Sequence, residues 1–147
     1  MIPMSELVVL DTSVCVHLVR HNALGQRIDR DYGLTARPER PLVSIVTVGE
    51  AMYLADRFGW GAEKTRVLSD LLAQLVVVDV AQGDIVRRYA GIAAHSWRHG
   101  LNIGDNDAWI AATAAAAGAW LLTTDKDFDR IHPQFVTRVW IDPAGAV

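Results

Sequence analysis

The sequence predicts an α/β fold: a three-layer α/β/α sandwich with a mostly parallel sheet of four or five strands. Short apolar runs rich in β-branched residues alternate along the chain with patterns of helical period. Strands that alternate with helices form parallel sheets, and the connecting helices cover both faces. The chain has 147 residues and no linker or repeat interrupts the series. We therefore expect residues 1–147 to form a single domain.

The first half of the chain is predicted to contain one strand and four helices. Glu6 to Leu10 forms a strand that ends at Asp11, and a helical pattern runs from Val14 to Val19. Residues 33–41 are expected to form a polar loop, after which Ser44 can cap a helix. The further helices are predicted over residues 23–31, 45–58 and 62–73.

The second half is predicted to alternate between strands and helices. Strands are expected over residues 75–79, 120–124 and 136–141, and helices over residues 82–97 and 108–117. Asp105 or Asn106 is expected to cap the second helix, and residues 127–131 to make one short turn. Because residues 108–117 are mostly alanine, this helix should lie close against a neighbouring element.

Composition narrows the class of protein. The formal net charge of −3 lacks the strongly basic balance typical of many nucleic-acid-binding domains. No apolar stretch approaches the roughly 20 residues of a membrane-spanning helix, and the first residues do not resemble a secretory signal. We expect a soluble, cytoplasmic protein that does not associate with membranes. Cys15 is the single cysteine, so any metal must use oxygen or imidazole ligands.

The basic residues are almost all arginine, since only Lys64 and Lys126 are lysines. Guanidinium groups suit contacts with phosphate, so a cluster of arginines weakly favours a nucleic-acid ligand. An equally good interpretation is a solvated helix face with ion pairs to Asp29, Asp31 and Glu39. The cluster consists of Arg20, Arg27, Arg30, Arg37 and Arg40.

Acidic residues occur where the predicted sheet would bring them together. Asp11 and Asp125 directly follow strands, and Asp107 lies in the first turn of a helix. In open α/β sheets, ligands bind outside the carboxyl ends of the strands. Glu50 lies between Gly49 and Ala51 in an apolar helix, and these small neighbours would let its carboxylate face an inner groove. We expect all four acids to share one edge of the sheet.

Four carboxylates without basic partners repel one another and raise each other's pKa, so such a cluster usually holds a hard cation. Ligation by oxygen alone fits Mg²⁺ or Mn²⁺ best. Two such ions about 4 Å apart can activate water and stabilise the leaving oxygen of a phosphodiester. The predicted reaction is therefore hydrolysis of a nucleic-acid backbone.

Each acid also has a purely structural interpretation. Asp11 can cap the first helix, and Glu50 can pair with Arg57 on an outer face. Asp125 can belong to a surface turn. Asp105 and Asp107 can cap a helix and favour its dipole, and for Asp105 we prefer this role.

Four segments of the sequence contain the four acids. They are Val9-Leu-Asp-Thr-Ser13, Thr47-Val-Gly-Glu-Ala51, Asn106-Asp-Ala-Trp-Ile-Ala-Ala-Thr-Ala114 and Leu122-Thr-Thr-Asp-Lys-Asp-Phe128. Their order and spacing are similar to the successive signatures of the PIN-domain family. The resemblance is strongest to VapC-like toxin ribonucleases and extends from about Val8 to Ile141.

The resemblance implies a PIN-like fold and a Mg²⁺- or Mn²⁺-dependent endoribonuclease, the toxin of a type II toxin–antitoxin module. It implies catalytic and metal-binding roles for Asp11, Glu50, Asp107 and Asp125. It also implies an RNA substrate such as tRNA or rRNA, a homodimer and a cognate antitoxin protein. A basic antitoxin segment is expected to place an arginine among the acids and displace the metal. Residues 23–41 match no motif, and substrate choice is assigned to them.

Five further residues stand beside the matched positions. The hydroxyl residues Thr12, Ser13 and Thr123 are candidates to orient a ligand or bridge a water. Roles in turns and caps are an equally good interpretation of these three residues. Asp105 and Asp127 are additional acids, and the sequence leaves open which member of each pair touches metal.

The alternative function is a non-catalytic PIN-like or receiver-like α/β module that binds RNA or protein. A receiver requires paired acids after its first strand and a lysine after a late strand. Asp11 is followed by Thr12, and Lys126 is a partial match. An aspartyl phosphatase would carry a second acid where Ser13 stands. The complete set of four acids therefore favours catalysis.

Other reactive side chains are interpreted as structural. His95 and His99 are four residues apart on a predicted helix but have no third ligand nearby in sequence. Cys15 has no histidine partner and is expected in the core. The tryptophans lie mostly in apolar runs and are expected to pack, and only Trp60, between two glycines, is expected to be exposed.

Overall fold

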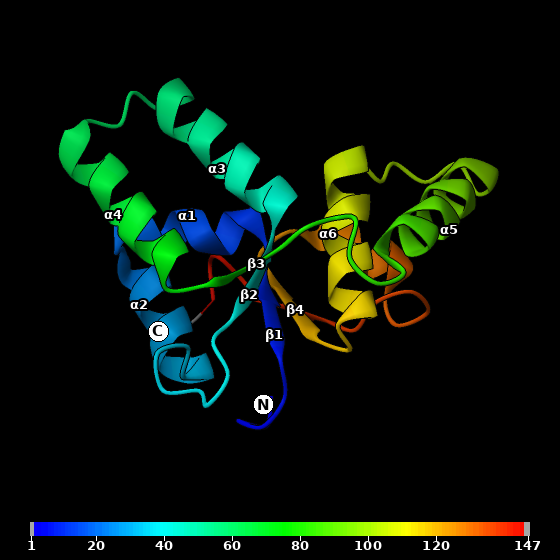
Figure 1. Cartoon of the computed structure of the whole chain (residues 1–147), viewed down its shortest axis with the longest axis horizontal. Helices are drawn as coiled ribbons and strands as arrows, with labels where there is room; N and C mark the ends of the chain where they lie inside the picture. The colour runs from blue at the N-terminus through cyan, green and yellow to red at the C-terminus, as the bar shows by residue number, and fades with distance from the viewer. Residues whose placement is uncertain (1, 146–147) are drawn as a thin grey trace.

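The structure, a computed structural model that describes residues 2–145, is an α/β fold around a five-stranded parallel sheet (Figure 1). The strand order is β3-β2-β1-β4-β5, and every neighbouring pair is parallel. The strands are β1 (Val8–Leu10), β2 (Leu42–Ser44), β3 (Val76–Val78), β4 (Trp120–Thr123) and β5 (Arg138–Trp140). The predicted fold class is confirmed.

Helices cover both faces of the sheet. Figure 1 shows α1, α2 and α4 on one side and α5 and α6 on the other. Within residues 2–145, no helix is both long enough and apolar enough to cross a membrane. The helices are α1 (Thr12–Arg20), α2 (Ala23–Tyr32), α3 (Ile45–Arg57), α4 (Ala62–Ala73), α5 (Ile85–Arg98), α6 (Asp105–Ala116) and the 3₁₀ helix η1 (Lys126–Ile131).

The order of the strands creates a switch point between β1 and β4. From β1 the chain builds outward through β2 and β3, and it then returns to place β4 on the other side of β1. Leu10 at the end of β1 is in register with Leu122, so Asp11 and Thr123 leave the sheet at the same edge. Such switch points are where ligands bind in open α/β sheets.

Two apolar cores lie on the two faces of the sheet, because successive strand residues point in opposite directions. Val9 and Leu121 belong to the core under α5 and α6, whereas Leu10 and Leu122 belong to the core under α1 and α2. On α6 the buried side chains facing the sheet are mainly small, as the sequence predicts. They include Ala108, Ala111, Ala112 and Ala114, each at most 1% exposed.

The structure corrects the sequence prediction in two places. Leu42–Ser44 forms β2, where the sequence predicted only the end of a loop and a cap. Ser44 ends this strand and also caps α3, because its hydroxyl accepts a hydrogen bond from the backbone N–H of Val46. Neither Asp105 nor Asn106 caps α6. The helix begins at Asp105 with Gly104 as the N-cap and no side-chain capping bond.

The arginine-rich segment has structural roles that were not predicted. Arg37 is 7% exposed and its guanidinium donates to backbone oxygens, including those of Pro3 and Glu6. Arg27 donates to the backbone oxygens of Asp142 and Gly145. For Arg37 the phosphate-binding hypothesis is wrong, because this side chain ties the N-terminal segment to the loop after α2.

Candidate metal centre

Asp11 is held rigidly at the carboxyl end of β1. It caps α1 through a 2.8 Å hydrogen bond from the backbone N–H of Thr12 to Oδ1. Its other oxygen, Oδ2, accepts hydrogen bonds from the hydroxyls of Thr123 (2.6 Å) and Ser13 (3.2 Å). The pKa of Asp11 is raised to about 6. Burial is the main cause, the three hydrogen bonds lower the pKa, and the charge of Asp125 contributes to the rise.

Thr123 joins the two acids that follow neighbouring strands. Its fully buried hydroxyl donates to Asp11 and accepts a 2.9 Å hydrogen bond from the backbone N–H of Asp125. Asp125 in turn caps η1, since its Oδ1 accepts from the backbone N–H of Asp127 at 2.8 Å. The capping roles of Asp11 and Asp125 therefore do not exclude a ligand role. They fix where the carboxylates point.

Glu50 reaches the same group of acids from α3. The hydroxyl of Thr12 donates to its Oε1 at 2.7 Å, and Nδ2 of Asn106 donates to its Oε2 at 3.0 Å. Thr12 is also hydrogen-bonded to the buried hydroxyl of Thr47, one turn before Glu50 on the same helix. Glu50 lines a hollow together with Asp107, as the sequence predicted. Its hydrogen-bond partners are these two neutral donors and not Arg57.

Asp107 lies in the first turn of α6, where the other acids surround it. Carboxylate oxygens of Asp107, Asp125 and Asp127 lie within 4.8 Å of one another. Burial first, and then the charges of Asp11, Asp125, Glu50 and Asp127, raise the pKa of Asp107 to about 7. The close group of oxygens thus contains Asp107, Asp125 and Asp127, while Asp11 and Glu50 lie near enough for their charges to act on Asp107.

Asp105 differs from Asp127. It is exposed and accepts a 3.0 Å hydrogen bond from the hydroxyl of Tyr89, whose ring stacks on Trp109 with 3.8 Å between the ring centroids. Asp105 lies at the rim of an open hollow beside Glu50 and Asp107, but the close group of oxygens contains Asp127 instead. Of the two additional acids, Asp127 is the one placed for a ligand role.

The acids have no cationic partner among the described residues. Within residues 2–145, the ion pairs of Lys, Arg and His involve other carboxylates, all of them on the surface. Lys126 adjoins Asp125 in the chain, but its ammonium lies 4.5 Å from the centroid of the Trp140 ring. A group of carboxylates in which Asp11 and Asp107 have raised pKa values, and which has no cationic partner within residues 2–145, is suited to a divalent metal bound by oxygen.

Sequence reasoning missed Asn106, which donates to Glu50, and Thr47, which is hydrogen-bonded to Thr12. Asn106 directly precedes Asp107, and Thr47 lies three residues before Glu50, so the helical period could have pointed to Thr47. The contact between Asn106 and Glu50 spans 56 positions of sequence and depends on how α3 and α6 pack. No local pattern contains that information.

The side chains judged structural behave largely as expected. Cys15 is buried, and burial first, with the charge of Asp11, raises the pKa of its thiol to about 12. The rings of His95 and His99 lie 4.2 Å apart, and no third ligand joins them in the described part of the chain. The expectation for Trp60 is wrong. It packs beside Phe58, whereas Trp97 on α5 is 84% exposed.

Comparison with protein-family models gives a match to the PIN domain over residues 8–132. The chain belongs to the PIN-domain family. All four acids named from the sequence, and Asp127, lie inside the matched range. The resemblance recognised from four short segments is therefore confirmed at the level of the family.

Curated relatives of this PIN domain carry the name Ribonuclease VapC. Ribonuclease VapC2 of Haemophilus influenzae is 27% identical over 125 residues, which cover 83% of this chain and 89% of the relative. Ribonuclease VapC2 of Rickettsia felis is 27% identical over 135 residues, which cover 89% of this chain and 96% of the relative.

Solved structures share the fold over nearly the whole chain. VapBC2 from Rickettsia felis, bound to a DNA fragment from its promoter, has a TM-score of 0.78 at 23% identity and covers 92% of this chain and 99% of its own. VapBC-1 from nontypeable Haemophilus influenzae has a TM-score of 0.74 at 25% identity and covers 91% of this chain and 97% of its own. The sheet order and helix layers described above are thus those of a PIN-like fold.

Proposed function

We propose that this PIN domain is a metal-dependent endoribonuclease and the toxin component of a type II toxin–antitoxin pair. The observation that carries the proposal is the group of carboxylates at the β1/β4 switch point, where the pKa of Asp107 is raised to about 7 and no cation of residues 2–145 pairs with it. The relatives named Ribonuclease VapC support ribonuclease chemistry. The VapBC structures support a toxin role.

The donor set fits Mg²⁺ or Mn²⁺. Asp11, Glu50, Asp107 and Asp125 are the proposed ligands and catalytic residues, with Asp127 close enough to two of them to share the charge of an ion. All offer hard oxygen donors, and Cys15, the one thiol of the sequence, lies buried in the core. When bound, the divalent metal supplies Lewis acidity and a more acidic water for hydrolysis of the phosphodiester.

The protein's own contribution is to fix the carboxylates before substrate arrives. Thr123 and Ser13 hold one oxygen of Asp11, while Thr12 and Asn106 hold Glu50. These bonds hold Asp11 and Glu50 against rotation away from the other acids. Preorganised groups of this kind lower the reorganisation that accompanies charge development in the reaction.

The protein is further proposed to be a cytoplasmic homodimer that binds a basic antitoxin protein. Negative potential at the acid group attracts a basic segment, and an arginine among the carboxylates would satisfy charges that otherwise require metal. The RNA is proposed to be a structured cellular RNA such as tRNA or rRNA. The receiver-like alternative is less well supported, because Lys126 contacts Trp140.

The test is cleavage of RNA by the full chain freed of any copurified inhibitor. The protein is incubated with total cellular RNA plus Mg²⁺ or Mn²⁺, and the cut ends are mapped. We expect discrete cuts that disappear with EDTA and in Asp11→Asn, and that persist in the matched control Asp31→Asn, which changes an exposed acid on α2. Folded, metal-loaded protein that leaves a broad RNA pool intact would favour a binding module.

A further inference from the structure

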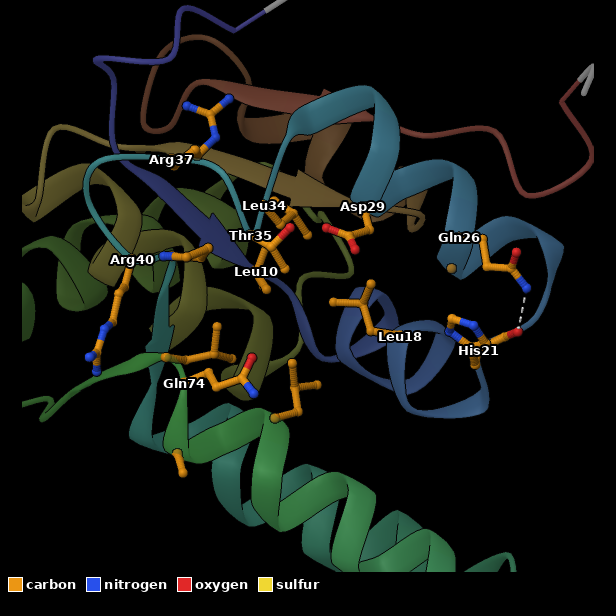
Figure 2. A pocket seen from close by; sticks show the side chains of 15 residues that line it. Leu10, Leu18, His21, Gln26, Asp29, Leu34, Thr35, Arg37, Arg40 and Gln74 are labelled. Atoms are coloured by element: carbon orange, nitrogen blue, oxygen red, sulfur yellow. Dashed lines mark hydrogen bonds between the residues drawn. The ribbon is translucent and has the colours of Figure 1, made fainter.

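A second site candidate lies away from the acid group. A cavity of about 450 Å³, partly open to solvent, lies between α1, α2, the loop over residues 33–41 and the end of α4 (Figure 2). Its walls are largely apolar and include Leu10, Leu18, Leu34, Leu71 and Leu75. None of the five acids of the candidate metal centre lines it. Volume and lining resemble those of pockets that hold small molecules, typically about 300–1,000 Å³.

One polar atom inside this leucine-lined cavity lacks a partner. Oδ1 of Asp29 is buried and accepts no hydrogen bond within residues 2–145. Figure 2 shows the carboxyl group of Asp29 directed into the cavity beside Leu34 and Thr35. Because buried polar atoms in folded proteins are almost always hydrogen-bonded, an unpaired carboxyl oxygen indicates a missing donor.

The arginines of the lining do not supply that donor. Arg37 is committed to backbone oxygens, including those of Tyr32 and Pro3. Arg40 extends away from Asp29 in Figure 2. Gln26 donates its amide to the backbone oxygen of His21. His21, Arg37 and Arg40 line the cavity, but within residues 2–145 no cationic side chain forms an ion pair with Asp29.

We propose that the cavity binds a small cationic amphiphile, an alkylammonium or alkylguanidinium compound. Its head group donates to Asp29, and its aliphatic stem packs on the leucines. The unpaired oxygen of Asp29 selects the head, because it forms a charge-assisted hydrogen bond with a cation and only a weaker hydrogen bond with a neutral group. Apolar walls select the stem, because each buried methylene gains free energy on leaving water. The proposal does not depend on the nuclease function.

The first measurement is titration of the full chain with n-pentylguanidinium chloride at constant ionic strength, followed by calorimetry and by methyl NMR. Pentan-1-ol and pentanoate are the neutral and anionic comparisons. We expect the cation to bind at least roughly ten-fold more tightly than the alcohol, and pentanoate to show no binding. Methyl shifts are expected at Leu10, Leu18 and Leu34.

Variants distinguish binding in the cavity from a non-specific attraction of the cation to an acidic protein. Asp29→Asn is expected to abolish the preference for the cation, while the matched control Asp31→Asn, an exposed acid two residues away, leaves it unchanged. Leu71→Trp, which fills the cavity from a half-buried wall position, is expected to block binding even where Asp29→Asn proves unstable.

Three results would overturn the proposal. The first is equal affinity for the alcohol and the cation, and the second is unchanged binding by a folded Asp29→Asn variant. The third is a set of shifts confined to residues around Asp107, which would mean that the cation only neutralises the acid group. RNA cleavage is not a readout here, so failure of this site leaves the proposed nuclease function intact.

Discussion

Asn106 donates a hydrogen bond to Glu50 and so links the first turn of α6 to the middle of α3. Thr12 occupies the other oxygen of the same carboxylate from α1. Three helices thus determine where one acid points. Groups that orient ligands in this way commonly change metal affinity by about 10–100-fold when they are removed.

Asn106→Ala is therefore expected to weaken Mn²⁺ binding by roughly ten-fold, because Glu50 becomes free to rotate away from the other acids. Calorimetric titration with Mn²⁺ measures this directly. Asn102→Ala, at an exposed position before α6, is the control and should bind as the parent does. Equal affinities for both variants would show that the contact with Glu50 does not position a ligand.

Asp127→Asn should reduce Mn²⁺ affinity more than Asp105→Asn. Asp127 belongs to the group of oxygens within 4.8 Å of one another, whereas Asp105 is exposed and bonded to Tyr89. We expect a loss of roughly ten-fold or more for Asp127→Asn and less than about three-fold for Asp105→Asn. The reverse order in the same titration would assign the ligand role to Asp105.

Removing metal should make stability depend on pH in a defined direction. The pKa of Asp107 is raised to about 7 and that of Asp11 to about 6, from 3.8. A carboxyl with a raised pKa in the folded state binds its proton more tightly there than in the unfolded chain. This stabilisation is complete below pH 3.8 and is lost as pH rises through the folded-state values.

Between pH 5 and pH 8, the metal-free protein is thus expected to lose about 1–2 kcal/mol of stability from the buried Asp11. Asp107 adds a further loss that is limited to roughly 1–2 kcal/mol, because solvent screens the charge of this partly exposed acid. Thermal unfolding in EDTA measures the loss, and added Mn²⁺ should restore the melting temperature at pH 8. Asp107→Asn should melt higher than the parent at pH 8 but not at pH 4. The control Asp56→Asn, an exposed acid on α3, should follow the parent.

Thr123→Val should destabilise the protein as well as its acid group. The valine leaves the backbone N–H of Asp125 without its acceptor and removes the 2.6 Å bond to Asp11. We expect a loss of about 1–3 kcal/mol in urea unfolding, together with weaker Mn²⁺ binding. Thr113→Val changes another fully buried threonine, which donates to Trp109 within α6, and should leave Mn²⁺ affinity unchanged. Equal Mn²⁺ affinities in the two variants would contradict the prediction.

The sequence was informative wherever the relevant information is local. Helical period located α3 and α4 closely, because their apolar faces repeat over several turns and Gly59 and Gly61 separate them. Strand β2 was missed because it has no such local pattern. Three residues that run directly into a helix carry no period of their own, and Ser44 gave a strong capping signal instead.

The sequence predicts which acids lie near one another but not how their side chains are arranged. Asp11 and Asp125 follow strands, and parallel strands share their carboxyl edge, so their proximity follows from the fold class alone. The distinction between Asp105 and Asp127 rests on Tyr89, which lies on α5 and reaches across to Asp105. Exposure of Trp97 likewise depends on the packing of α5, which no run of neighbouring residues reveals.

The alanines of α6 have a further consequence for protein design. An aspartate has a short side chain, so Asp107 reaches the other acids only because Ala108, Ala111 and Ala112 let the helix approach the sheet. Larger side chains at these positions would move the helix outward and carry the carboxylate with it. Transplanting the acids alone into another α/β scaffold should therefore fail to create a metal site, and the small residues beneath the helix would have to be transplanted with them.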